Sequence, residues 1–125
     1  MKRLCLVILA LPLALGAEDE KKKDFTKLVP VEGTVVCLGC ELEKDGADAQ
    51  CTLHSKHAQA LKDGDGRLWN FLDNTRGHVL RTNEKLRGKE IRVHAWKYDK
   101  ALHLEVWRYE VKDGDKWTMY SYCDN

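Results

Sequence analysis

The sequence predicts a mostly β fold, a small domain of five to six antiparallel strands with one short helix. Segments rich in β-branched and aromatic residues recur along the chain, and clusters of Gly, Asp and Asn separate them. One stretch combines a helix start, apolar positions and a helix stop. At 125 residues, the chain has the length of a single domain.

Residues 1–17 are predicted to be a secretory signal peptide. Two basic residues precede an apolar run from Leu4 to Leu15, and small residues follow it up to Ala17, where we place the cleavage. The run is too short to span a bilayer. We therefore expect an exported protein, periplasmic or secreted, with no membrane segment after cleavage.

Cleavage would leave a charged, flexible leader at residues 18–27 and one domain at residues 28–125. Loss of Lys2 and Arg3 changes the balance from 21 basic and 20 acidic residues to 19 and 20, a formal charge of −1. A nearly neutral domain carries no electrostatic footprint for nucleic acid. We therefore expect no nucleic-acid partner.

The first three strands are indicated by composition and by the turns between them. The first runs from Val29 to Val36 and contains Gly33, which within a strand marks a bulge or a bend. The second and third, Ala58–Leu61 and Arg67–Leu72, flank the turn Asp63–Gly66, whose glycines can adopt positive φ. These features predict a hairpin after the first strand.

The single predicted helix extends from Asn74 to Leu86. Asn74 or Thr75 would cap its first turn, and Gly88 would end it. Gly77 has a low helix propensity, so we expect the helix to be short.

A second hairpin is predicted from Glu90–Tyr98 and Ala101–Val111, which flank a turn at Asp99-Lys100. In that register the apolar residues share one core face: Ile91, Val93, Ala95, Leu102, Leu104 and Val106. After Val106 the apolar phase changes to Trp107, which predicts a bulge or a barrel corner.

The other face of this hairpin carries titratable residues. The predicted register places His103 opposite Trp96 and Glu105 opposite His94. His94, His103 and Glu105 could form an acid–base or metal-binding patch. We favour a solvated sheet face with cross-strand pairs.

A last aromatic strand, Trp117–Tyr122, leads to Cys123. The order of strand, Cys/His loop, hairpin, helix and hairpin is that of an OB-fold, a small barrel that binds ligands over its second and third strands. In the alternative of a disulfide-stapled ligand-binding domain, Trp69 and Phe71 would lie on that face. An SH3-like barrel and an open antiparallel sheet are the alternatives.

The most informative segment is the loop between the first two strands. Cys37 and Cys40 form a CxxC pair, and Cys51 and His54 repeat that spacing further along. Three thiolates and one imidazole form a tetrahedral set that zinc prefers and that also suits copper(I). We predict that these four residues bind zinc, with copper as the alternative. His57 would be a further ligand, a partner of the ligands or a surface residue.

Two other chemistries compete with metal binding. In an exported protein, Cys37–Cys40 or Cys40–Cys51 could form a disulfide, with the remaining cysteine reaching Cys123, and no cofactor would then bind. The third possibility is a redox-active CxxC pair. We disfavour it because no helix pattern follows Cys40, whereas thioredoxin-like pairs lie at a helix N-terminus.

Four segments resemble small exported bacterial OB-fold-like proteins with a CxxC…CxxH loop: Val35–Cys40, Gln50–His54, Leu68–Leu72 and Leu86–Val93. The resemblance implies the barrel and a metal or thiol site, but no reaction. We predict a binding or accessory module, not an enzyme, whose partners are a metal ion and an unidentified protein or small-molecule ligand. A disulfide-stapled ligand-binding domain comes second, and a thiol–disulfide redox protein third.

Overall fold

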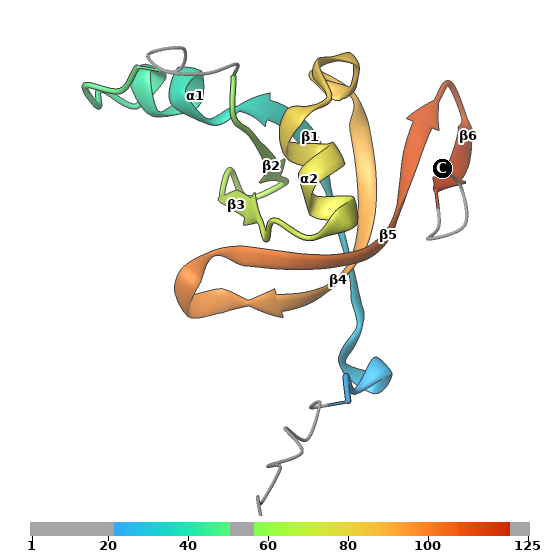
Figure 1. Cartoon of the computed structure of the whole chain (residues 1–125). Helices are drawn as coiled ribbons and strands as arrows, with labels where there is room; N and C mark the ends of the chain where they lie inside the picture. The colour runs from blue at the N-terminus through green and yellow to red at the C-terminus, as the bar shows by residue number, and fades with distance from the viewer. Residues whose placement is uncertain (1–21, 51–56, 121–125) are drawn as a thin grey trace, which may run out of the picture.

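The structure, a computed structural model, describes residues 22–50 and 57–120. Figure 1 shows the elements in chain order: η1 (Phe25–Lys27), β1 (Val29–Cys37), α1 (Leu38–Lys44), β2 (Gln59–Asp63), β3 (Leu68–Phe71), α2 (Thr75–Thr82), η2 (Glu84–Leu86), β4 (Glu90–Tyr98), η3 (Asp99–Ala101), β5 (His103–Asp113) and β6 (Lys116–Tyr120). The predicted signal peptide, Cys51, His54 and Cys123 lie outside the described residues. Among the described helices, none has the length and apolar character needed to cross a membrane.

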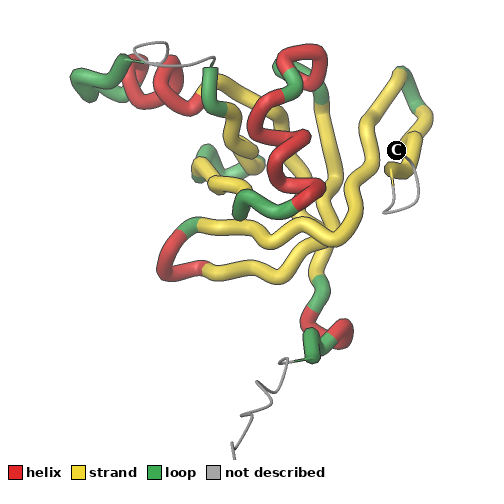
Figure 2. The backbone as a smooth tube through the Cα atoms, in the orientation of Figure 1, coloured by secondary structure: helices red, strands yellow, loops and turns green. Residues whose placement is uncertain are grey.

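Within residues 22–50 and 57–120, six strands form one sheet in the order β3-β2-β1-β4-β5-β6, and neighbours in this order are antiparallel. A parallel pairing through Phe71 and Leu104 also joins β3 to β5. Each strand from β1 to β5 therefore pairs on both sides, while β6 extends β5 as an outer hairpin (Figure 2). The predicted mostly β class is confirmed.

The core is one cluster of buried side chains from β1 to β5 and α2: Val35, Leu61, Trp69, Phe71, Leu80, Ile91, Val93, Ala95, Leu104, Val106 and Tyr109. Trp69 is fully buried and Phe71 is 3 % exposed. The prediction that these two residues line an open ligand-binding face is therefore wrong. They alternate with Asn70 along β3, so both point to the core side of the sheet.

Between its turn and its bulge, the β4–β5 hairpin differs from the predicted register by two positions. His103 lies opposite Tyr98, and Glu105 lies opposite Trp96. The connection is longer than a two-residue turn because η3 is followed by Leu102 in the left-handed conformation, with φ of 50°. Leu102, which we expected in the core, is exposed.

The predicted bulge in β5 is confirmed. The register shifts between His94 and Ala95, which makes Trp107 the extra residue of β5. Two residues on, Tyr109 is buried in the same core as Val106. The bulge thus explains the change of apolar phase along this strand.

Helix α2 begins where the sequence predicts, with the Asn74 side chain accepting the Gly77 N–H at 2.8 Å. It ends at Thr82 rather than Leu86, and the 3₁₀ turn η2 covers the remainder. Gly77 is required there, because a Cβ would lie 1.8 Å from the carbonyl oxygen of Leu72.

Helix α1 contradicts the expectation that no helix follows Cys40. Cys37 caps it: its Sγ accepts the N–H of Cys40 at 3.4 Å. Lys44 in the last turn pairs with Glu41 in the first. At seven residues, α1 is too short to show an apolar period in the sequence.

Candidate metal centre

Cys37 occupies the junction between β1 and α1, and it is 6 % exposed. One residue later, the N–H of Leu38 donates to the carbonyl oxygen of Ala58 at 2.9 Å. This bond ties the start of α1 to the segment that enters β2. As a result His57 lies beside Cys37, although 20 residues separate them.

The donor atoms of two cysteines and one histidine converge at this junction. Cys37 Sγ and His57 Nδ1 are 3.2 Å apart, and one ligand atom each from Cys37, Cys40 and His57 lies within 4.8 Å of the others. Around a tetrahedral zinc, with Zn–S of about 2.3 Å and Zn–N of about 2.0 Å, donor atoms lie about 3.5–3.8 Å apart. Small side-chain rotations would therefore bring all three donors onto one ion.

The backbone at the start of α1 also favours the metal-binding form of the thiol. The Cys40 N–H points at Cys37 Sγ, and a donated hydrogen bond stabilises a thiolate over a thiol. Thiolates, not thiols, bind metal ions. The capping role of Cys37 and its role as a ligand are thus compatible.

A buried acid next to the thiols is neutralised by two lysines. Glu41 is 7 % exposed, and its carboxylate accepts from Lys44 at 2.6 Å and from Lys62 at 2.7 Å. The hydrogen bond from Lys44, followed by that from Lys62, holds the pKa of Glu41 below its usual value. Two ammonium groups around one carboxylate leave a net positive charge beside the sulfurs.

The site opens into a cavity of about 270 Å³, whose wall includes Cys37, Cys40, Glu41, Lys44, His57 and Arg87. Arg87, which pairs with Glu84 at 3.3 Å, adds a further cationic side chain to this wall. Zinc with three thiolates and one neutral imidazole carries a formal charge of −1. The surrounding cations would therefore stabilise such a centre.

Of the four predicted ligands, the structure brings Cys37 and Cys40 together. Cys51 and His54 lie outside the described residues, so their predicted roles stay predictions. No disulfide joins Cys37 to Cys40.

His57, whose role the sequence left open, is the histidine that reaches the described cysteines. The pairing of β1 with β2 indicates the position of His57, because Cys37 lies opposite Gln59. Residues just before Gln59 must therefore pass the first cysteine. That signal needs the register between two strands, which spacing within one segment does not supply.

The alternative of an acid–base or metal patch on the β4–β5 hairpin, which we disfavour from the sequence, is not assembled. His94 Nε2 lies 2.9 Å from Glu110 Oε2, and His103 Nδ1 lies 2.7 Å from the carbonyl oxygen of Ala101. Glu105 contacts the leader instead. These three side chains therefore do not share an acid–base or metal site.

Comparison with known proteins places the chain in no family. No protein-family model, curated protein or solved structure matches it. The function must therefore follow from the donor atoms and their surroundings.

Proposed function

We propose that this chain is an exported metal-binding accessory module in which Cys37, Cys40 and His57 hold one zinc ion, with copper(I) as the alternative. The observation that carries this proposal is the convergence of two sulfurs and one imidazole nitrogen within 4.8 Å. Thiolate and imidazole donors select zinc or copper(I) over hard cations such as magnesium. Cys51 would complete the predicted Cys₃His set, with His57 in place of His54.

The position of the site favours a structural role for zinc. It connects the end of β1, the first turn of α1 and the segment that enters β2. Structural zinc in finger peptides contributes about 10–16 kcal/mol, while whole domains have a net stability of about 5–15 kcal/mol. Zinc would therefore order the loop, whereas bound copper would indicate a protein that carries or senses that metal.

We also propose that the metal loop belongs to an OB-type barrel. The pairings β1–β2, β2–β3, β3–β5, β5–β4 and β4–β1 form a continuous ring, and α2 connects β3 to β4. This ring supports the strand order inferred from the sequence. Strand β6 is an addition to the five-strand plan.

Metal content and thiol state, measured on protein from its own compartment, test the proposal. We expect about one zinc per mature chain, with the His57→Ala and Cys37→Ser variants losing at least tenfold in affinity. His54→Ala is the matched control and should retain the metal. If copper is recovered in place of zinc and a copper(I) chelator does not remove it, the bound metal is copper(I). Protein without metal and without titratable thiols would refute the metal centre.

A second function, thiol–disulfide exchange, is favoured by one observation. The CxxC pair begins α1, and His57 Nδ1 lies 3.2 Å from Cys37 Sγ. A helix N-terminus and a neighbouring imidazole both promote the reactive thiolate. Oxidation of the two thiols to a Cys37–Cys40 disulfide would release two protons and pass two electrons to a disulfide of the partner.

Titration of the metal-free chain in glutathione redox buffers separates the two functions. Thiol–disulfide exchange proteins have reduction potentials between about −270 and −120 mV. The titration would show whether a reversible Cys37–Cys40 disulfide falls within this range. Such a couple, in a chain that does not retain zinc during purification, would favour redox chemistry. Thiols that zinc protects from oxidation would favour the metal centre.

A further inference from the structure

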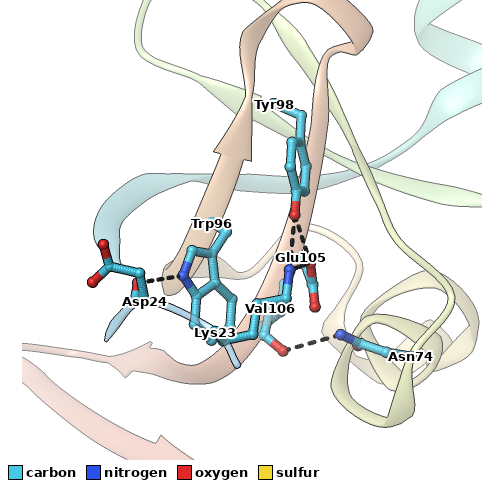
Figure 3. Close-up of polar contacts among 7 residues, drawn as sticks. All are labelled: Lys23, Asp24, Asn74, Trp96, Tyr98, Glu105 and Val106. Atoms are coloured by element: carbon cyan, nitrogen blue, oxygen red, sulfur yellow. Dashed lines mark hydrogen bonds and ion pairs between the residues drawn. The ribbon is translucent and has the colours of Figure 1, made fainter. Parts of the chain in front are cut away.

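Lys23, in the predicted leader, docks onto the β4–β5 hairpin on the face opposite the core (Figure 3). Its ammonium group donates to the hydroxyl of Tyr98 at 3.0 Å and to the carboxylate of Glu105, and the Tyr98 hydroxyl donates to the same carboxylate at 2.7 Å. The ammonium also lies 5.0 Å from the ring centroid of Trp96 and 5.7 Å from that of Tyr98. A carboxylate, a phenol and two aromatic rings thus surround one primary ammonium.

Phe25 provides a second anchor two residues later. Its ring contacts Trp96 and Trp107 edge-to-face, with centroid distances of 5.3 and 5.0 Å. Between the two anchors, Trp96 Nε1 donates to the carbonyl oxygen of Asp24 at 2.9 Å (Figure 3). The hairpin therefore contacts a lysine, one backbone carbonyl and an aromatic ring in fixed order.

The leader fills this surface incompletely. A cavity of about 450 Å³ adjoins it towards Tyr98, and another of about 210 Å³ adjoins it towards Asn74 at the start of α2. Lys23 and Trp96 form part of both walls. Phe25 remains 52 % exposed. A segment with so little buried surface can open at low cost.

We propose that Trp96, Tyr98, Glu105 and Trp107 form a binding site, the hairpin site, for an extended segment of a partner protein that carries a lysine two residues before an aromatic residue. The leader occupies the hairpin site in cis until such a segment displaces it. The lysine and phenylalanine seated there define the chemistry of the ligand.

Because the leader is covalently connected to the domain, its effective concentration at the hairpin site determines how much it weakens the binding of the partner segment. The leader continues through η1 directly into β1, and even a short flexible connection would give an effective concentration of about 1 mM. A peptide that binds the vacated hairpin site with a Kd of about 100 μM would therefore bind the native chain about tenfold more weakly. The metal centre has no part in this competition.

The probe is a fluorescein-labelled peptide with the sequence of residues 18–27, titrated against the mature full-length chain. The Lys23→Ala/Phe25→Ala variant should bind the peptide about tenfold more tightly than the native chain does. Adding Glu105→Gln to this variant should reduce binding at least fivefold, with circular dichroism verifying the fold. A matched peptide with glutamine in place of lysine at position 23 should lose binding to the same extent.

Two results would overturn the proposal. If the peptide binds neither the native chain nor the vacated variant at millimolar concentration, the leader is only a structural clamp. If light scattering shows dimers that form with rising concentration and disappear in Lys23→Ala, the segment comes from a second copy and not from a partner protein.

Discussion

At the residue scale, Gly33 is a position where the strand pairing tolerates no side chain. It lies opposite Asp63 of β2 and Ile91 of β4, in the short overlap where β1 pairs with both neighbours. A Cβ there would lie 2.3 Å from the carbonyl oxygen of Lys62. The sequence indicates a bulge or a bend at this glycine, and the structure shows that the carbonyl of Lys62 approaches it too closely for a side chain.

Gly33→Ala is expected to destabilise the protein by about 2–3 kcal/mol, because the carbonyl of Lys62 must move away from its strand partner. Urea unfolding at pH 7 would measure the loss. Gly64→Ala is the control, because nothing lies within 4 Å of its added Cβ, and its effect should stay within about 0.5 kcal/mol. Equal stability of the two variants would contradict the close approach.

The carboxyl group of Glu110, on the outer sheet face, makes the stability of the fold sensitive to acid. The hydrogen bond with His94 is the main cause that lowers the pKa of Glu110 below its usual 4.5, and Arg92 contributes as well. A carboxyl whose pKa is lower in the folded state stabilises the fold above pH 4.5. This stabilisation disappears as the pH falls through the lowered value.

We therefore expect Glu110→Gln to lose about 1 kcal/mol at pH 6 and to lose less on further acidification than the native chain does. Urea titrations at pH 6, 4.5 and 3 would show the two stabilities approaching each other. A constant difference across this range would be inconsistent with the lowered pKa.

At the scale of elements, caps rather than periodicity account for both helices. Helix α1 depends on Cys37 at its start and on the Glu41–Lys44 pair within it. Helix α2 depends on Asn74, which accepts the Gly77 N–H and also donates to the carbonyl oxygen of Val106 at 3.4 Å. Asparagine is a common cap and was identifiable, whereas a cysteine cap has no such statistical signal.

Asn74→Ala should destabilise the protein by about 1 kcal/mol, since the Gly77 N–H loses its acceptor. Asn74→Asp keeps the accepting oxygen but loses the amide that donates to Val106, so it should recover only part of that loss. Thermal unfolding monitored at 222 nm would rank the three proteins. If the alanine variant is as stable as the native chain, the cap contributes nothing.

At the scale of the whole molecule, the Cys37–Cys40–His57 group joins segments that are distant in sequence, and the zinc proposed for it would link them. Zinc in free concentration about 100-fold above its Kd should add about 2.7 kcal/mol, which for a domain near 100 residues is roughly 10–20 °C in Tm. Differential scanning calorimetry with zinc or with EDTA would measure this shift. His57→Ala, with an affinity at least tenfold lower, should reduce the shift to about half or less, while His103→Ala, away from the site, should retain it. An undiminished shift in His57→Ala would place the metal elsewhere.

Local patterns in the chain were sufficient for the mostly β class, the bulge near Trp107 and the Cys37–Cys40 pair. Each depends on neighbouring residues, whose φ preferences and side-chain alternation act over a few positions. Contacts between distant segments settle the rest: the hairpin register, the approach of His57 to Cys37, and the docking of Lys23 against Glu105. These depend on strand pairing and turn length, because a shift of one residue in a strand moves every side chain to the other face.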